Sequence, residues 1–286
     1  MMNRDMIDWN EVWKEQMLMQ NQSQHAVDCA AIWDKKENAQ LFLKMFQGKG
    51  EKLIENTLKD LPLTPESRVL DIGAGPGTLA IPLSEMVSHV TAVEPSPGMI
   101  GVLQDQITEN DIGNIKCVHK RWEDVEIGSD LEGSYDVVIA SYSLGMPDIK
   151  EAVRKMEAAS SRYVYIYWFA GETSWDANFK ALWPSLHGTN YYPAPKCDIL
   201  YNVLYRMGIY PHINVIPFEH VHRFSSEEES VDHFKSYFNI TEQHQDAILR
   251  DYLKDHLEED DDGAVILRGL TTRVKMWWEK GCDSGE

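Results

Sequence analysis

Hydrophobic positions follow a helical spacing in the first part of the chain. Met6, Trp9, Trp13 and Met17 recur every three or four residues and form one apolar stripe, so residues 1–60 are predicted to be a helical extension. Such a stripe is typical of a helix that packs on the body of a protein. It also fits a lid over a ligand or a dimer face, and the pattern alone does not decide between them.

From residue 68 onward, short apolar runs alternate with helical patterns. The runs predict strands at residues 68–73, 89–95, 114–122, 135–143, 162–171, 212–224 and 264–278. Helical spacing predicts helices at residues 78–87, 97–110, 148–160, 197–209, 225–238 and 241–257. This rhythm predicts an α/β domain over residues 61–280: a doubly wound, mostly parallel, seven-stranded sheet with helices on both faces. We expect the last two strands to pair at one edge.

Residues 170–196 interrupt the rhythm. The stretch "ETSWDANFKALWPSLHGTNYYPAPK" is rich in aromatic residues, glycine and proline, and it predicts a long loop inserted into the domain. A loop of this length is usually functional or disordered, and its aromatic content argues against disorder. The later stretch "LEEDDDG" predicts an exposed acidic turn.

Composition and charge exclude several classes of partner and location. The formal net charge is −19 over 286 residues and no Lys/Arg cluster appears, which argues against a nucleic-acid partner. The four cysteines are far apart and show no CxxC spacing, as expected in a reducing cytoplasm. Charges interrupt the N-terminal stretch, so we expect no signal peptide, and no apolar run reaches the roughly 20 residues that span a bilayer.

A glycine-rich loop with an acid on each side is the strongest chemical signal. In "VLDIGAGPGT" the loop follows Asp71, and Glu94 ends the next predicted strand. In open parallel sheets such loops bind ligands at the carboxyl ends of the strands. A dinucleotide site needs G-x-G-x-x-G, but Thr78 takes the third glycine position and Asp71 is unfavourable beside a pyrophosphate. S-adenosylmethionine fits better, because its ammonium group suits one acid and its ribose diol the other.

Three stretches together, "VLDIGAGPGTLAIPL", "VTAVEPSPGMI" and "YDVVIASYSLGMPD", resemble successive motifs of the class I S-adenosylmethionine-dependent methyltransferases. The resemblance covers roughly residues 65–170 and implies a Rossmann-like methyltransferase fold, with S-adenosylmethionine as cofactor and S-adenosylhomocysteine as product. Where many members have a glycine pair before the fifth strand, this chain has "AASSRY".

The resemblance also implies roles for individual residues. The methionine end of the cofactor is assigned to Asp71, Gly73, Ala74 and Gly75, and the ribose to Glu94. Adenine contacts are assigned to Ser96, Met99, Trp122 and Glu123. The end of the fourth strand, Ser141 and Tyr142, is expected to lie under the methyl donor.

Methyl transfer from a sulfonium needs alignment above all, and a general base only if the acceptor must lose a proton. Candidate bases in the aromatic segment are Glu172, Asp176, His187, Tyr191 and Tyr192, of which His187 and Tyr192 are the predicted catalytic residues. Trp168, Trp175 and Trp183 are expected to line the substrate site or to pack in the hydrophobic core beneath the segment.

A histidine cluster is the remaining candidate for chemistry. His212, Glu219, His220 and His222 fall on one predicted strand, with His220 and His222 on one face, but no third metal ligand is fixed and no metal site is predicted. We expect a cytoplasmic methyltransferase acting on a small molecule. The alternatives are a protein or RNA substrate, binding without catalysis, or a nicotinamide-dependent oxidoreductase, which Thr78 and Asp71 argue against. The sequence does not specify the acceptor or the oligomeric state.

Overall fold

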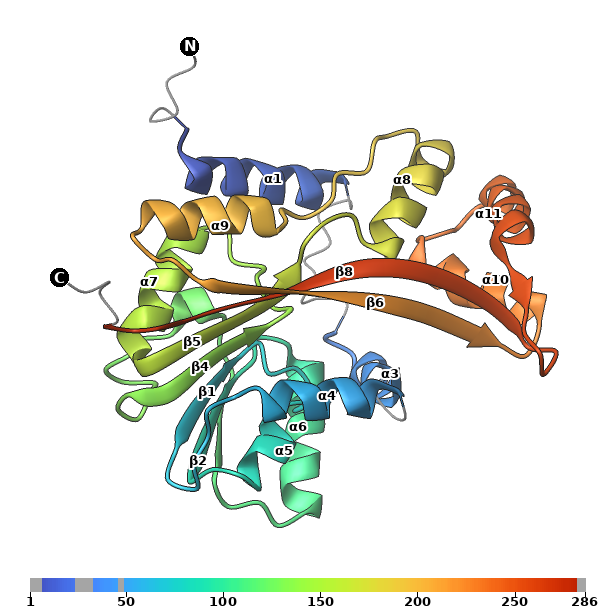
Figure 1. The fold of residues 1–286 in the computed structure, drawn as a ribbon. Helices are drawn as coiled ribbons and strands as arrows, with labels where there is room; N and C mark the ends of the chain where they lie inside the picture. Colours follow the sequence, from blue (N-terminus) through green and yellow to red (C-terminus); the bar gives the residue numbers. More distant parts are fainter. Residues whose placement is uncertain (1–6, 24–32, 46–48, 282–286) are drawn as a thin grey trace.

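A twisted sheet runs through the centre of the protein, and helices cover both of its faces (Figure 1). The computed structural model describes residues 7–23, 33–45 and 49–281. The strands are β1 (Arg68–Ile72), β2 (His89–Val93), β3 (Ile115–Val118), β4 (Tyr135–Ser141), β5 (Ser160–Phe169), β6 (His212–Phe224), β7 (Glu258–Glu259) and β8 (Val265–Glu279).

The helices follow the predicted positions with one addition. They are α1 (Trp9–Ser23), α3 (Lys36–Met45), α4 (Lys49–Lys59), α5 (Ala80–Ser84), α6 (Pro97–Glu109), α7 (Ile149–Ala159), α8 (Ser174–His187), α9 (Cys197–Arg206), α10 (Glu227–Tyr237) and α11 (Gln243–His256), with a 3-10 turn η2 (Trp122–Asp124). Among the described residues, no helix is both long and apolar enough to span a membrane.

Strand order in the sheet is β3-β2-β1-β4-β5-β8-β6. The first five strands are parallel, and β8 runs antiparallel between β5 and β6. The predicted mostly parallel, doubly wound sheet is therefore confirmed, as is the pairing of the last two long strands. The predicted acidic turn needs a small correction, because its first residues form the two-residue strand β7 against β8. Strand order reverses between β1 and β4, which is where such sheets bind ligands.

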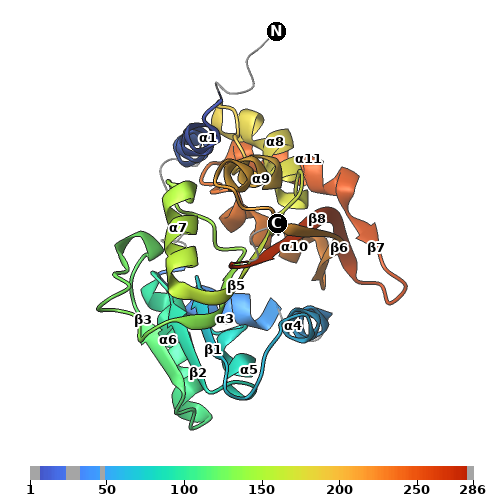
Figure 2. The same ribbon diagram turned by 60° about the vertical axis from the view of Figure 1, so that its left-hand side comes forward.

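Alternating side chains on the central strands serve two separate cores. Val69 belongs to a core beneath α4 and α5, whereas Leu70 belongs to the core beneath α7 and α9. Figure 2 shows α7 and α9 on one side of the sheet and α4 on the other. Because both faces are covered, β1 and β4 are buried at almost every position, as strands of a parallel sheet are.

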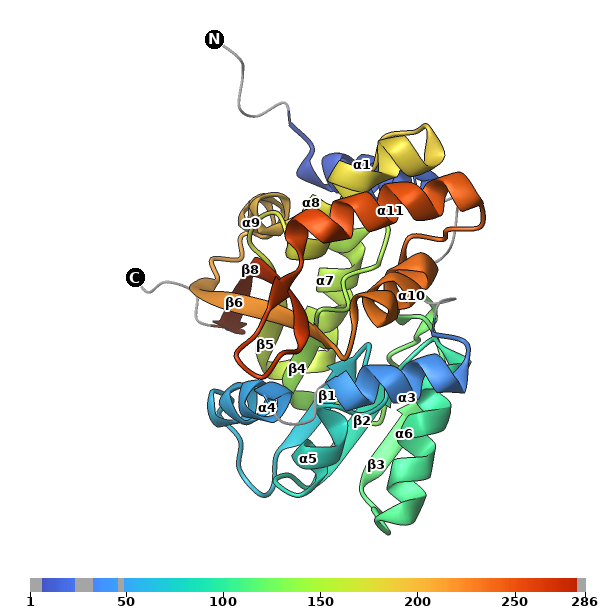
Figure 3. The same cartoon turned by 90° about the vertical axis from the view of Figure 1, so that its right-hand side faces the viewer.

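The paired strands β6 and β8 continue past the end of β5. Residues 273–279 of β8 pair with β5, but β8 also pairs with β6 from residue 265 to residue 277. The overhanging part carries a third core under α8, α10 and α11, and Figure 3 shows α8 and α11 next to each other on the side away from α3 and α4.

Helix α8 overturns the predicted long loop over residues 170–196. Thr173 and Asp176 form a capping box at its start, and Gly188 ends it with φ 70°. Pro184 lies inside the helix. The aromatic residues of the segment are therefore arranged by a helix rather than by a loop.

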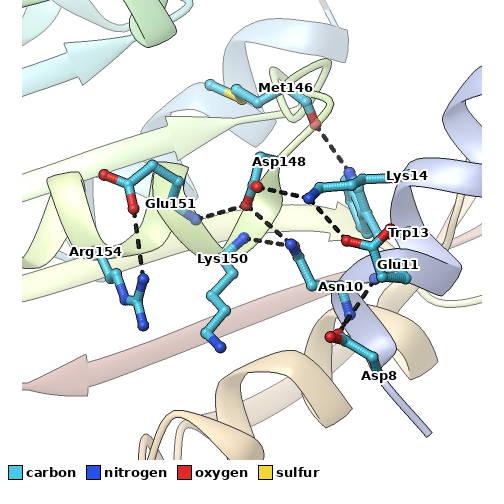
Figure 4. A network of polar contacts seen from close by, with 10 residues as sticks. All are labelled: Asp8, Asn10, Glu11, Trp13, Lys14, Met146, Asp148, Lys150, Glu151 and Arg154. Atoms are coloured by element: carbon cyan, nitrogen blue, oxygen red, sulfur yellow. Dashed lines mark hydrogen bonds and ion pairs between the residues drawn. The ribbon is translucent and has the colours of Figure 1, made fainter.

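The N-terminal helix α1 docks on the start of α7 through a polar network (Figure 4). The Asn10 side chain donates to Asp148 Oδ1 at 3.0 Å and accepts from the Lys150 N–H at 2.9 Å. Buried Trp13 donates its Nε1–H to the Met146 carbonyl at 2.9 Å. Trp13 and Met17 of the predicted stripe thus face the protein, while Met6 lies outside the described residues.

Candidate functional site

A cavity of about 740 Å³ opens at the carboxyl ends of β1, β2, β4 and β5. Most predicted cofactor residues line it: Asp71, Gly73, Ala74, Gly75, Glu94, Met99, Trp122, Glu123, Ser141 and Tyr142. The structure therefore brings together residues that are up to 71 positions apart in the chain, from Asp71 to Tyr142. Ser96, His187 and Tyr192 are not part of the lining.

The glycine loop is shaped by two requirements that only glycine meets. Gly73 has φ 71°, and a Cβ on it would lie 2.2 Å from Ser143 Cβ, so the loop and the segment after β4 approach too closely for any side chain. Gly75 has φ 57°, yet a Cβ there would meet nothing within 4 Å. Gly75 thus keeps the backbone open toward the cavity, which leaves room for a ligand against the main chain.

Glu94 is held at the end of β2 by backbone donors. Its Oε2 accepts from the Gly75 N–H at 2.9 Å and its Oε1 from the Ser96 N–H at 2.8 Å. Burial raises the pKa of Glu94, and the two N–H donors act in the opposite direction. The carboxylate is thus fixed in place beside the glycine loop.

Asp71 is a buried carboxyl group without a complete set of partners. It is 1% exposed, and its Oδ2 has no hydrogen-bond partner. Burial, and then the charge of Glu94, raise the pKa of Asp71 to about 7. A buried polar atom without a partner is costly, so this oxygen is poised for a donor supplied by a ligand.

Ser96 and Met99 take different positions at the start of α6. Ser96 is the N-cap, and its hydroxyl donates to the Trp33 carbonyl at 2.6 Å while accepting from the Met99 N–H. A Cβ on Gly98 would lie 2.2 Å from the Trp33 carbonyl oxygen, so the chain at residue 33 rests directly on this helix. Met99 reaches the cavity, whereas Ser96 joins the N-terminal extension to α6.

Trp122 and Glu123 lie in the turn η2 at the side of the cavity. The Trp122 indole donates to the Ala152 carbonyl at 3.1 Å and is 2% exposed. Lys155 Nζ donates to the carbonyls of Trp122, Glu123 and Val125. Trp122 is therefore both a core residue and a wall of the cavity, and the carbonyl contacts hold Glu123 beside it.

Aromatic side chains from several elements form the part of the cavity toward β5 and β8. Tyr142 and Phe169 rings lie 5.1 Å apart, and Phe169 meets Trp175 of α8 at 5.0 Å. Tyr142 has φ 55°, an uncommon conformation for a residue with a side chain, and such strain is often found at functional sites. Burial raises the pKa of Tyr142, so its hydroxyl stays protonated at neutral pH and acts as a donor rather than as a base.

The two predicted catalytic residues lie away from this lining. His187 is the last residue of α8, and its Nε2 lies 2.9 Å from the Phe238 carbonyl oxygen, against the Trp183 ring. Tyr192 is 39% exposed, and its N–H donates to Ser23 Oγ at 3.3 Å. Of the other candidate bases, Asp176 accepts from the Tyr191 hydroxyl and pairs with Lys196 at 2.7 Å. The catalytic assignment stays a prediction, which this geometry does not favour.

The histidines on β6 do share a face. His220 Nε2 and His222 Nε2 are 3.0 Å apart, and burial lowers the pKa of both. Across residues 7–23, 33–45 and 49–281, no group of three or more His, Cys, Asp or Glu side chains is arranged to hold a metal ion.

Several lining residues were not identified from the sequence. Arg273 of β8 reaches the cavity, as do Met17 and Gln20 of α1 and Phe42 of α3. The sequence does not single out Arg273, because its strand, "VILRGLTTRVKMWW", also carries Arg268 and Lys275. The N-terminal residues gave no signal of their own beyond an amphipathic helix.

The residues present fit the predicted cofactor. The unpartnered Asp71 Oδ2 suits an ammonium group, and the Glu94 carboxylate suits a diol. The open space at Gly75 allows a ligand to lie against the backbone between them. Either acid would be unfavourable beside a pyrophosphate, which a dinucleotide would bring to the same loop.

Comparison with known proteins agrees with this geometry. Residues 69–161 match a family model described as a methyltransferase domain. An uncharacterized protein of Haemophilus influenzae is 30% identical over 188 residues, which is 65% of this chain and 66% of that protein. A 23S rRNA (uracil(1939)-C(5))-methyltransferase of Klebsiella pneumoniae is 28% identical over 127 residues, 44% of this chain and 29% of that enzyme.

Solved structures show the same fold at low sequence identity. The YcgJ protein of Bacillus subtilis superposes with a TM-score of 0.54 at 15% identity, covering 78% of this chain and 97% of that one. A candidate methyltransferase of Bacillus halodurans gives a TM-score of 0.56 with the same identity and coverage. The chain thus spans about two thirds of the Haemophilus protein and under a third of the rRNA enzyme.

Proposed function

We propose that the chain is a class I S-adenosylmethionine-dependent methyltransferase that methylates a small-molecule acceptor, which the match of residues 69–161 to a methyltransferase-domain model supports. The observation that carries the proposal is a single cavity that joins two sets of residues. Asp71, Gly75 and Glu94 line one part, and Tyr142, Phe169 and Trp175 line another. A donor bound at the first set and an acceptor bound at the second would share one enclosed space.

Residues of this chain would bind the cofactor and align the acceptor with it. Asp71 would hold the ammonium group of S-adenosylmethionine, Glu94 the ribose hydroxyls, and Met99 and Trp122 the adenine. When bound, this cofactor supplies a methyl group already activated by a positive sulfur, and its loss leaves neutral S-adenosylhomocysteine. Tyr142, held with φ 55° at the end of β4, would orient the acceptor through its hydroxyl. A residue that removes a proton is needed only if the acceptor carries one.

The size and lining of the cavity favour a small acceptor. Its volume of about 740 Å³ lies within the roughly 300–1,000 Å³ typical of small-molecule sites. Helices α1 and α3 add Met17, Gln20 and Phe42 to its wall, and we propose that residues 1–60 serve as a cover that limits access. A protein acceptor would have to insert a side chain beneath that cover.

An RNA acceptor has one observation in its favour, the partial similarity to an rRNA methyltransferase. The net charge of −19 argues against it, because phosphate contacts require a basic surface. We therefore retain a small molecule as the acceptor and the cytoplasm as the compartment, in line with the unpaired Cys117 and Cys197.

The test begins with ligand binding measured by calorimetry. We expect S-adenosylmethionine and S-adenosylhomocysteine to bind and NAD not to bind, and binding of NAD alone would reject the proposal. Methyl-labelled S-adenosylmethionine is then incubated with the protein and a metabolite extract, or with ribosomal RNA. Label in a low-mass product supports a small acceptor, label in RNA or protein identifies another class, and binding without any transfer favours a cofactor-binding protein.

A further inference from the structure

Arg273 holds a buried positive charge at the edge of the cavity. It lies in β8 opposite Phe169 of β5, where β8 begins to run beyond the end of that strand. Its side chain lines the cavity, while its Nε and Nη1 are buried and have no hydrogen-bond partner. A guanidinium remains charged at any ordinary pH, so this charge is present in the folded protein.

No carboxylate neutralises this charge within the part of the chain that the structure describes. The arginines at other positions of β6 and β8 behave differently. On β8, Arg268 pairs with Glu258 and Glu219. On β6, Arg223 pairs with Asp260 and Asp262. Lys196, which lies over the Phe169 ring, pairs with Asp176 at 2.7 Å. A buried charge without a partner is strongly unfavourable, so Arg273 is the exception that requires an explanation.

Two aromatic rings hold the guanidinium but leave the hydrogen bonds of Nε and Nη1 unmade. Its central carbon lies 3.5 Å from the centre of the Phe218 ring and 5.0 Å from the centre of the Tyr142 ring. Ring faces attract a cation, although they accept no strong hydrogen bond from its N–H groups. Tyr142 also lines the cavity, and its protonated hydroxyl interacts with the guanidinium as a neutral group, so this region lacks a charged acceptor.

We propose that the methyl acceptor is an organic anion whose carboxylate or phosphate group binds Arg273. The inference rests on the proposed function and specifies its substrate class. The Arg273 side chain already borders the cavity, together with Tyr142, Phe169 and Trp175. An oxyanion accepts two parallel N–H bonds from a guanidinium, and the Phe169 and Trp175 rings offer an apolar wall for the rest of the molecule.

The test uses simple anions as probes. Benzoate, phenyl phosphate and neutral benzamide are titrated by NMR into the protein labelled at the arginine side chains, with and without S-adenosylhomocysteine. We expect at least one anion to bind about tenfold to a hundredfold tighter than benzamide and to shift the Arg273 Nε–H signal. The two anions separate a carboxylate site from a phosphate site.

Matched variants assign the preference to Arg273. Arg273→Gln should bind acid and amide equally, Arg273→Lys should recover part of the preference, and Arg268→Gln, the same change on the same strand, should keep all of it. Equal affinity of acid and amide in the unaltered protein, no binding of either anion, or a preference that survives Arg273→Gln would overturn the inference. Loss of S-adenosylhomocysteine binding would instead reject the proposed function, because the anion preference is also measured without that ligand.

Discussion

The two sides of the cavity bury opposite charges. Near β1 and β2, two carboxyl groups, Asp71 and Glu94, lie 1% and 6% exposed beside the glycine loop. Three strands from β1, beyond β4 and β5, the guanidinium of Arg273 on β8 is buried against two rings. The Glu94 carboxylate is fixed by local backbone donors, whereas the cation is held mainly by aromatic side chains.

This difference in buried charge would let one cavity bind two ligands of opposite charge in separate places. A cationic donor is favoured beside the acids and disfavoured beside the arginine, and an anionic acceptor has the reverse preference. Each buried charge lowers stability until its ligand arrives, so the ligand-free protein carries an energetic cost at both places. The expected effects of substitutions follow from which of these charges they remove.

The largest effect is expected from Asp71→Asn in the ligand-free protein. The pKa of Asp71 rises from 3.8 to about 7 on folding, so the folded state holds a proton that the unfolded state loses. Its contribution to stability is fully present below pH 4 and is lost as the pH rises through about 7, a change on the order of 4 kcal/mol. The asparagine side chain of the variant does not titrate. The variant should therefore gain that amount relative to the parent protein between pH 4 and pH 8, measured by denaturant unfolding.

The same titration should control cofactor binding. Affinity for S-adenosylmethionine should rise with pH up to about 7 and then level off, because only the ionised Asp71 attracts the ammonium group. The Asp71→Asn protein should bind more weakly at pH 8 and show a flatter pH profile. A stability difference between the two proteins that is constant with pH would mean that the Asp71 carboxyl group is not held neutral by burial.

A smaller loss is expected from Glu94→Ala, measured as affinity for S-adenosylhomocysteine. The change removes a charged acceptor for two hydroxyls, worth about 1.5–3 kcal/mol, or roughly tenfold to a hundredfold in Kd. Glu109→Ala, at the exposed end of α6, is the matched control and should bind normally. Unchanged affinity in a folded Glu94→Ala protein would show that the ribose is held by other residues.

The third effect tests how α1, part of the proposed cover, is held on the protein. Trp13→Phe removes the buried hydrogen bond to the Met146 carbonyl and leaves that group without its partner, at a cost of about 1–2 kcal/mol in the free energy of unfolding. Lys14→Ala removes only solvent-accessible ion pairs to Glu11 and Asp148, so it should cost less than Trp13→Phe. Equal losses in the two variants would mean that α1 is held by its surface charges and not by Trp13.

The two sides of the cavity also differed in how well the sequence predicted them. The acids and glycines follow one another within two strand–turn units, and the positive φ of Gly73 and Gly75 is a local requirement that the residue type reveals. Arg273 lies some 200 positions from Asp71, and only the insertion of β8 between β5 and β6 brings it to the same cavity. Spacing along the chain carries no information about such a long-range contact.

The sequence predicts a loop where the structure has helix α8, for a different reason. Its aromatic, glycine and proline content favoured a loop, although Thr173 with Asp176 and Gly188 are ordinary signals for the start and end of a helix. Pro184 also favours a loop, because proline is rare inside helices, so composition and capping signals point in opposite directions here. In the structure Tyr142 lines the cavity, whereas His187, at the end of α8, does not.

The smallest expected effect, a change in benzoate affinity, distinguishes Tyr142 from His187. Tyr142→Phe removes one neutral donor from the cavity wall, so benzoate should bind about twofold to tenfold more weakly, equivalent to roughly 0.5–1.5 kcal/mol, while affinity for S-adenosylhomocysteine stays nearly constant. His187→Ala breaks the contact with the Phe238 carbonyl in the core under α8. It should lower the thermal midpoint slightly and leave benzoate binding unchanged, as should Tyr192→Phe at an exposed position. Both ligands are titrated into all three variants at pH 7.5, and methyl transfer is compared once an acceptor is known. If His187→Ala or Tyr192→Phe abolished transfer while Tyr142→Phe did not, the acceptor would lie against α8 and the guanidinium side of the cavity would have another purpose.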